Sequence, residues 1–203
     1  EGGQRQLDSA VVKNGAFTFN GVVQNPVEAV VVVSAEGKPL RQLEDPDRRS
    51  VFLSKGVITL KGENLRSAKL AGNKINDDLA KYDLASAQVK AAAEKLIASY
   101  ANATDDQRNS ESFMVDLQNN YDKLMEQQEV IDVDFIKANP GSYVSLSILD
   151  DRLEPANVAD FQTLYASLDA NLKNSSKGKS LNDKINNMIK LAVGQVAPDF
   201  TLP

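Results

Sequence analysis

The spacing of apolar residues changes once along this chain of 203 residues, near Gly72. Before Gly72, apolar and polar residues alternate over short runs bounded by Gly, Asn and Pro, which is typical of antiparallel strands. After Gly72, apolar residues recur every three or four positions over long stretches, which is typical of amphipathic helices. The sequence therefore predicts an α+β fold. A small antiparallel β-sheet or sandwich domain is expected over residues 1–71, followed by an α-helical region over residues 72–192.

The N-terminal part predicts four or five strands and no helix. A hairpin is expected where Val11-Val12 and Phe17-Thr18-Phe19 flank the turn signal Asn14-Gly15. The β-branched run Val27 to Val33 predicts a central strand buried on both faces. The segment Lys38 to Arg49, which contains two prolines and several acidic residues, predicts a loop. Two further strands are expected around Lys55-Gly56: Ser50 to Leu53 and Val57 to Leu60.

Two apolar stripes predict a long antiparallel helical hairpin. The first stripe steps by four and three residues, and Ser86 is its only polar member. The second begins after the capping-box pattern Thr104-x-x-Gln107 and ends at Asn139-Pro140, with a break expected between Gln128 and Asp132. Each helix would contain about 26 to 30 residues and extend roughly 40 Å. The short connection makes them antiparallel neighbours. The stripes are Ile75, Leu79, Tyr82, Ser86, Val89, Ala93, Leu96 and Tyr100, then Phe113, Leu117, Tyr121, Leu124, Ile131 and Phe135.

Three shorter helices are expected over Ser142 to Asp150, Asn157 to Leu172 and Ser180 to Leu191. The polar tract Asn174 to Lys179 predicts a solvated loop between the last two. Its Gly-Lys-Ser sequence does not make a phosphate-binding loop, because Lys173 occupies the position of the upstream glycine.

Histidine, cysteine and tryptophan are absent from the sequence. Their absence from these residues excludes nucleophile–histidine pairs, thiolate or imidazole zinc sites, and the usual haem and iron–sulfur ligands. Carboxylate, lysine or tyrosine chemistry remains. The net charge is −5, from 23 basic and 28 acidic residues mixed along the chain, so we do not expect a nucleic-acid partner. No stretch approaches the ~20 apolar residues of a transmembrane helix, and no leader opens the sequence.

The candidate site residues are carboxylates and tyrosines. Asp132 and Asp134 have the spacing that opens a calcium loop, but Lys137 and Tyr143 occupy the positions of its glycine and glutamate. Adjacent acidic residues do not face each other on a helix, so we interpret three such pairs as helix-start or solvated charges. We expect the tyrosines to lie in the core with their hydroxyls satisfied. We therefore predict no catalytic, cofactor-binding or metal-binding residue. The pairs are Asp77-Asp78, Asp105-Asp106 and Asp150-Asp151, and the tyrosines are Tyr82, Tyr100, Tyr121, Tyr143 and Tyr165.

Three triplets fit modification patterns. Asn102-Ala103-Thr104 and Asn174-Ser175-Ser176 fit the acceptor pattern for N-linked sugars, but we interpret them as a helix cap and a loop. Asp8-Ser9-Ala10 resembles the O-glycosylation triplet of Bacteroidetes envelope proteins. An unmodified intact mass from the native host would remove that hypothesis.

Several segments together carry a family resemblance. Residues Asp8 to Pro26 resemble the core of a β-rich domain of unknown function that precedes the thioredoxin-like module in many thiol-disulfide oxidoreductases of Bacteroidetes. Ser50 to Ile58, Gly72 to Asn76 and Phe135 to Ser142 resemble its later strands and its helical segment. Near the end of the sequence, Gly194-x-x-Ala197-Pro198-Asp199-Phe200-Thr201-Leu202 resembles the opening segment of thioredoxin-like proteins of the peroxiredoxin and TlpA type.

The resemblance implies that residues 193–203 are a linker and the start of a thioredoxin-like domain whose Cys-x-x-Cys pair lies outside this sequence. It implies a noncatalytic N-terminal accessory domain of an envelope thiol-disulfide oxidoreductase, serving positioning, substrate-protein recognition or dimerisation. The expected location is the periplasm or cell envelope, with a lipid anchor as one option for the full-length protein. The expected partners are the thioredoxin-like module of the same polypeptide, a second copy, and protein substrates. No cofactor is expected for these residues.

One departure from the family pattern concerns the N-terminus. One or two strands usually precede the Asp-Ser-Ala segment, where this sequence has only Glu1 to Leu7. We therefore expect a sheet that is incomplete or that borrows an edge strand from another copy.

Two alternative functions stay open. One is a stand-alone ligand- or glycan-binding module of the envelope. The other is a carboxylate enzyme, which would need two acids within about 10 Å in a concave pocket.

Overall fold

The computed structural model describes residues 6–154 and 158–191. It divides into two compact units, residues 1–73 and residues 74–203, which we call the β unit and the helical unit. A small antiparallel β region followed by a mostly helical region confirms the predicted α+β fold. The expected linker and start of a thioredoxin-like domain, the residues before Gln6, and the expected helix start at Asn157 lie outside the described residues.

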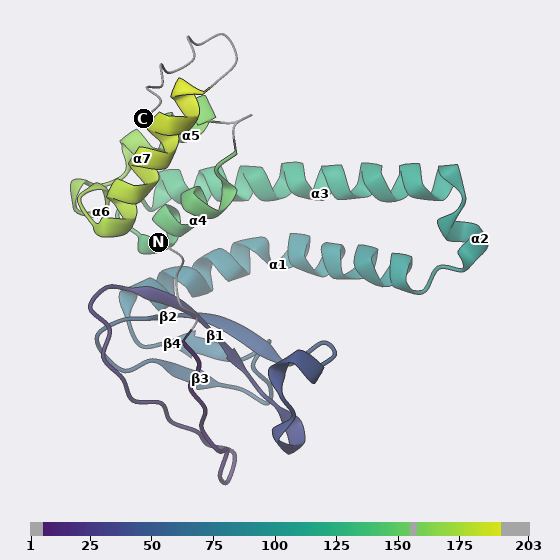
Figure 1. Cartoon of the computed structure of the whole chain (residues 1–203), viewed down its shortest axis with the longest axis horizontal. Helices are drawn as coiled ribbons and strands as arrows, with labels where there is room; N and C mark the ends of the chain where they lie inside the picture. The colour runs from purple at the N-terminus through teal and green to yellow at the C-terminus, as the bar shows by residue number, and fades with distance from the viewer. Residues whose placement is uncertain (1–5, 155–157, 192–203) are drawn as a thin grey trace, which may run out of the picture. The chain divides into compact units, whose positions relative to one another are not determined.

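The β unit contains two separate antiparallel pairs of strands (Figure 1). Strand β1 (Val27–Val32) pairs with β2 (Arg48–Leu53), with Val27 opposite Leu53. Strand β3 (Thr59–Lys61) pairs with β4 (Lys69–Ala71). The buried apolar side chains of this unit lie on β2 and β4 and on the turn before β4: Val51, Phe52, Leu65, Ala68 and Leu70.

The prediction of a central strand buried on both faces is wrong. Among the described residues, β1 has one strand neighbour, β2. Val27 and Val30 expose 49% and 55% of their surface. A β-branched run favours the extended backbone, but it does not determine how many faces other elements cover.

The expected hairpin over residues 11–19 forms only its turn. Asn14 and Gly15 both have positive φ, as a tight two-residue turn requires, and Lys13 and Ala16 exchange two backbone hydrogen bonds. This pair is an isolated bridge, and no strand ladder extends from it in the described residues. Val11 and Val12 are exposed, so the flanking residues lack the packing that would hold them in a sheet.

The expectation of no helix in this unit is also wrong. Two short 3-10 helices occupy Ala35–Gly37 and Leu40–Gln42, inside or beside the predicted loop. That loop ends earlier than predicted, because β2 begins at Arg48. Strand β4 lies outside the strands that the sequence predicts. Its residues precede Gly72, whose φ of +130° and close approach to the Val57 carbonyl oxygen exclude a side chain.

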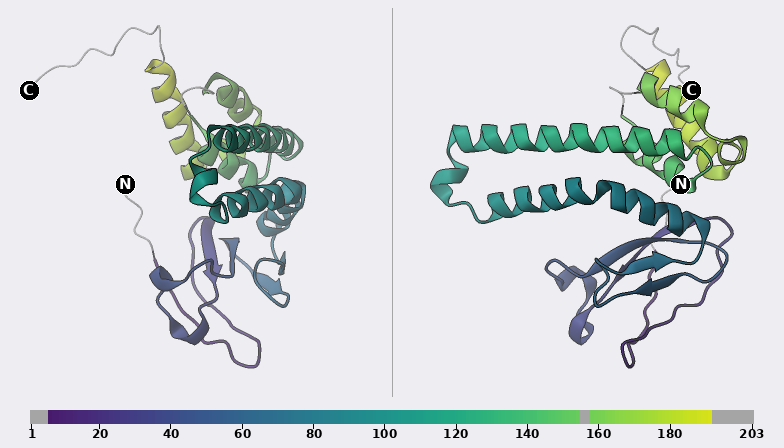
Figure 2. Two further views of the ribbon diagram at one scale, coloured as in Figure 1. Left: turned by 90° about the vertical axis from the view of Figure 1, so that its right-hand side faces the viewer. Right: turned by 180° about the vertical axis from the view of Figure 1, so that it is seen from behind.

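The helical unit is built on two helices of 28 residues each, α1 (Lys74–Ala101) and α3 (Glu111–Ala138). They run antiparallel and side by side (Figures 1 and 2). At the standard rise each extends about 42 Å. The predicted hairpin is therefore confirmed. The break expected between Gln128 and Asp132 is wrong, because both polar residues lie on the α1-facing side of a continuous α3 and bond across the seam.

The connection between α1 and α3 contains a short helix, α2 (Asp105–Arg108). The predicted capping box is confirmed. Thr104 Oγ1 accepts from the Gln107 backbone amide, and Gln107 Oε1 accepts from the Thr104 amide. Arg108 donates to the carbonyl oxygen of Ala103, which lies at the end of the turn after α1. The tip of the hairpin is thus closed by satisfied backbone groups.

Four more helices pack at the end of the hairpin where α1 begins and α3 ends (Figure 2). They are α4 (Tyr143–Arg152), α5 (Val158–Ser167), α6 (Ala170–Lys173) and α7 (Ser176–Lys190). The most deeply buried apolar side chains of the unit gather here: Ile136, Val144, Leu146, Leu149, Leu181 and Ile185.

Two predictions in this region need correction. The helix expected over residues 157–172 is divided into α5 and α6, with Asp169 at the start of α6. The solvated loop expected over Asn174 to Lys179 is wrong, because α7 already begins at Ser176. Ser175 is its N-cap and accepts from the Gly178 amide at 3.0 Å. Serine is common in loops and also at helix N-caps. Only its position relative to the helix shows which of these roles it has.

Candidate functional site

A buried polar cluster joins the two long helices where the other helices pack. Tyr82 and Ser86 come from α1, Gln128 and Asp132 from α3, and Arg152 from the end of α4; we call these five residues the seam cluster. The Tyr82 hydroxyl donates to Asp132 Oδ1 at 2.6 Å. Gln128 Nε2 donates to Asp132 Oδ1 at 2.7 Å, to the Tyr82 hydroxyl at 3.0 Å and to Ser86 Oγ at 3.3 Å.

Both carboxylate oxygens of Asp132 are engaged. Oδ1 accepts from Tyr82 and Gln128, and Oδ2 lies 3.1 Å from Arg152 Nε. Burial raises the pKa of the Tyr82 phenol, and the hydrogen bond to the Asp132 carboxylate raises it further, so the phenol stays protonated and donates. Phe135 packs edge-on against the Tyr82 ring at 5.2 Å between ring centroids.

The geometry of the seam cluster fixes the register of α1 against α3. Tyr82 and Ser86 are one turn apart on α1, as Gln128 and Asp132 are on α3. A slip of one turn between the helices would leave polar groups buried without partners. The sequence distinguishes Ser86 as the polar member of its stripe but does not predict its partners. Gln128 and Asp132 carried a matching signal, because they continue the spacing of the second stripe.

Replacing Asp132 by Ala is expected to lower the free energy of unfolding by about 2 kcal/mol, because Tyr82 and Gln128 would lose their buried acceptor. Arg152 is half-exposed and would be rehydrated, which limits the loss. Chemical denaturation followed by far-UV circular dichroism measures the change. Asp134→Ala, two residues away at an exposed position, is the matched control and should change stability by less than about 0.5 kcal/mol. Equal effects of the two substitutions would show that the seam cluster adds no stability.

The first acidic pair is separated by the helix. Asp77 is exposed on the first turn of α1, whereas the Asp78 side chain is 2% exposed. Lys74 and Lys81 lie 2.8 Å and 3.1 Å from the two Asp78 oxygens. Burial alone would raise the pKa of Asp78, but its hydrogen bonds with Lys74, Lys81 and Ser142 outweigh burial and lower it. The buried carboxylate is therefore ionised and paired.

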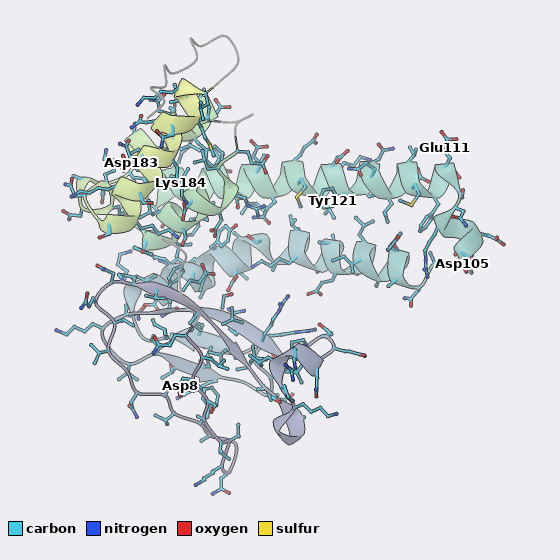
Figure 3. All side chains as sticks on the ribbon, in the orientation of Figure 1. Asp8, Asp105, Glu111, Tyr121, Asp183 and Lys184 are labelled. Carbon is cyan, nitrogen blue, oxygen red and sulfur yellow. The ribbon has the colours of Figure 1, made fainter. Side chains whose placement is uncertain are left out.

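The pair Asp150-Asp151 is divided in the same way. Asp150 Oδ1 accepts from Lys184 at 2.5 Å, and Asp150 Oδ2 lies 3.3 Å from Lys177; both lysines come from α7, where Figure 3 shows Lys184. Burial opposes ionisation of Asp150, but the two lysines outweigh burial and lower its pKa. Partial desolvation raises the pKa of Asp151, which is exposed overall, and the Asp150 charge adds to that.

The pKa of Asp150 is lowered and that of Asp151 is raised. Substitutions of these two neighbours should therefore change the pH dependence of stability in opposite ways. A lowered pKa of Asp150 means that its ion pairs stabilise the fold above the unfolded value of 3.8 and are lost as pH falls through the folded pKa. Asp150→Asn should therefore reduce stability near neutral pH and flatten its fall between about pH 5 and pH 2. The raised pKa of Asp151 means that its ionisation opposes folding as pH rises, so Asp151→Asn should slightly stabilise the protein near neutral pH. Denaturation midpoints across this range test both; a steeper acid transition for Asp150→Asn would contradict the assignment.

The remaining candidates stay apart from one another. Asp105 and Asp106 lie on the first turn of α2, at the far end of the hairpin from the seam cluster, where Figure 3 labels Asp105. Asp134 is exposed while Asp132 is buried, so the calcium-like spacing does not bring them together. No group of three or more acidic residues in the described ranges is arranged to hold a metal ion.

The tyrosines only partly follow the prediction of core packing. Tyr82 is in the seam cluster, and the buried Tyr165 hydroxyl donates to the Gly178 carbonyl at 3.0 Å. Burial raises the pKa of Tyr143 and of Tyr165. Tyr100 and Tyr121 are 44% and 50% exposed, so the prediction is wrong for both. They lie on the distal half of the hairpin, away from α4, α5, α6 and α7, which pack at its other end.

Two of the three modification triplets contain the N-cap residue of a helix. Thr104 and Ser175 cap α2 and α7 with their side chains. Asp8 and Ser9 are exposed, and the Asp8 carboxylate accepts from the Ser9 amide at 2.7 Å.

The surface hollows of the described part of the chain include two shallow ones. The hollow of the β unit, about 260 Å³, is lined by Val23, Gln24, Asn25, Pro26, Ser54 and Lys55. It is smaller than typical ligand pockets. The other, about 410 Å³, lies on α3. No helix within the described residues is both long enough and apolar enough to cross a bilayer.

Comparison with known proteins finds a match for the N-terminal part alone. No curated protein and no solved structure matches the chain. The model of one protein family, DUF4369, matches residues 1–79, which cover the β unit and the first residues of α1. The matching family is described as a domain of unknown function, so the match over residues 1–79 gives a likeness of the β unit and no activity.

Proposed function

We propose that this chain is a noncatalytic accessory region of an envelope thiol-disulfide oxidoreductase, and that its helical hairpin positions a thioredoxin-like module relative to protein substrates. The observation that carries the proposal is the resemblance of residues 194–202 to the opening segment of thioredoxin-like domains, following the helical unit in sequence. The DUF4369 match supports the β-rich part of the same resemblance.

The construction of the hairpin supports a positioning role. Two helices of 28 residues form an arm of about 42 Å, closed at its tip by the capping box and fixed in register at its base by the seam cluster. The carboxylates buried in the helical unit, Asp78 and Asp132, are held by lysine, arginine or hydrogen-bond partners. These ion pairs and hydrogen bonds stabilise the packing of the helices, and that packing fixes the length of the arm.

The length of the arm can be changed without touching either end. Residues 93–99 of α1 lie opposite residues 115–121 of α3 in the register set by Tyr82 and Asp132. Deleting both segments from the native polypeptide removes about two turns from each helix and shortens the arm by about 10 Å. The deletion changes the helical phase by only about 20°.

We expect this shortened polypeptide to reduce a small aromatic disulfide at an unchanged rate, since the redox centre is untouched. Reduction of a protein disulfide, such as that of insulin, should fall about tenfold because the arm misplaces the substrate. The matched control keeps the length and replaces the exposed residues of the same two segments by alanine. Equal rates with insulin for wild type and the shortened variant, or equal losses for the shortened variant and the control, would contradict a positioning arm.

A further inference from the structure

The outer side of α3 combines an apolar groove with unpaired negative charge. The groove, about 410 Å³, is lined by Glu126, Glu129, Val130, Val133 and Asp134 in the described part of the chain. These positions are three, four, seven and eight residues apart, so they share one face of the helix. Leu124, Gln128 and Asp132 are buried on the side facing α1, so the groove lies on the opposite side of α3.

The apolar part of this face is accessible to different degrees at its two valines. Val130 exposes 60% of its surface, and Val133, one turn further along the same face, is half-buried. Helix α3 thus has two apolar sides, one covered by α1 and one that the described residues leave accessible. A helix that serves only its own hairpin needs a single apolar stripe.

The three carboxylates of the groove are unpaired among the described residues, and the two lysines of α3, Lys123 and Lys137, lie one turn beyond its two ends. Seven acidic residues and two lysines give α3 a net charge of −5, equal to that of the whole chain. The side chains of Glu126, Glu129 and Asp134 form no ion pair or hydrogen bond with the described residues. By contrast, Asp78, Asp132 and Asp150 each contact a lysine or an arginine.

We propose that this groove binds a cationic amphipathic helix of a partner protein, with aliphatic side chains against Val130 and Val133 and lysine or arginine side chains against the three carboxylates. The groove extends about 12 Å along α3, the length of two helical turns. Aliphatic anchors spaced three and four residues apart fit such a surface, and cations on the same segment complete the charge. The proposal does not depend on a redox module, so it stands or fails separately from the function proposed above.

The test uses the chain of 203 residues and a fluorescent synthetic helix of leucine and lysine in amphipathic spacing. Fluorescence anisotropy should show saturable binding that weakens as salt is raised. The triple substitution Glu126→Gln, Glu129→Gln, Asp134→Asn should weaken binding about tenfold, since three exposed ion pairs are lost. The matched control, Glu94→Gln, Glu111→Gln, Asp116→Asn, removes the same charges elsewhere on the hairpin and should leave affinity within about twofold. Figure 3 shows Glu111 at the far end of α3.

A second pair of variants separates the apolar contact from the charge. Val130→Gln should weaken binding severalfold, whereas Leu84→Gln, at a more exposed apolar position on α1, should not. Far-UV circular dichroism of each variant shows that the hairpin remains folded. Equal losses for the groove and control triples would mean nonspecific charge attraction and would overturn the proposal. Self-association of the chain that the groove substitutions abolish, without peptide binding, would overturn it in favour of a second copy as the occupant.

Discussion

Replacing Leu124 by Asp is expected to lower the free energy of unfolding of the helical unit by about 4 kcal/mol. Leu124 is only 9% exposed and lies in the seam between α1 and α3, four residues before Gln128. The substitution removes apolar contacts and buries a carboxylate in the seam two turns before Asp132, whose partner Arg152 is already engaged. Because the seam extends along the hairpin, the loss should appear as reduced helix content at low denaturant concentration.

The control for this substitution is its neighbour in sequence. Lys123→Asp introduces the same side chain at an exposed position of α3 and should change stability by less than about 1 kcal/mol. Leu96→Asp, at a half-buried position of α1, should fall between the two. A Leu124→Asp variant that unfolds at the wild-type denaturant concentration would show that α1 and α3 do not pack in the register described.

Replacing Gly178 by Ala is expected to destabilise the protein by about 3 kcal/mol. A Cβ atom at this position would lie 2.0 Å from the Leu172 carbonyl oxygen and 2.9 Å from Lys173 Cα, so α6 and the first turn of α7 would have to separate. The same residue accepts the hydrogen bond of the buried Tyr165 hydroxyl, which the movement would strain. The opposing backbone is the obstacle, and it cannot rotate away as a side chain would.

Thermal or chemical denaturation of Gly178→Ala measures this effect, with Ser180→Ala as the control. Ser180 lies on the same helix at an exposed position, so its replacement should be nearly neutral. A stable Gly178→Ala variant would mean that α6 and α7 do not approach each other so closely.

The parts of this fold that the sequence predicted are those governed by long or reciprocal patterns. The stripe from Ile75 to Tyr100 extends over seven turns and identifies α1. The reciprocal pair Thr104 and Gln107 identifies a helix start from two independent positions. In both cases several residues agree, and no tertiary contact is needed to choose between structures.

The parts that failed depend on contacts between distant residues. Val27 to Val33 has the composition of a buried strand, yet whether a strand is central depends on neighbours that its own residues do not specify. Gly178 suggests a loop from the sequence alone. Its close approach to the Leu172 backbone, which requires a glycine, is visible only in the folded structure. The three-residue strand β4 carries too few residues for any period to be visible.

The seam cluster shows why the polar residues were the hardest to interpret. Gln128 and Asp132 interrupt an apolar stripe, and by themselves they suggest a helix break. Their role appears only when the antiparallel register places them opposite Ser86 and Tyr82. The register in turn depends on the length of the turn around α2, which the pattern of either helix alone does not give.

The most direct test of the proposed function is thiol titration of the native polypeptide, expressed from its coding sequence through and beyond Pro203, together with an insulin-reduction assay. A pair of reactive thiols, with insulin reduction that disappears when the polypeptide is truncated at Pro203, is the result expected of an accessory region joined to a thioredoxin-like module. A native polypeptide without a reactive dithiol would contradict that role and would make the resemblance of residues 194–202 misleading.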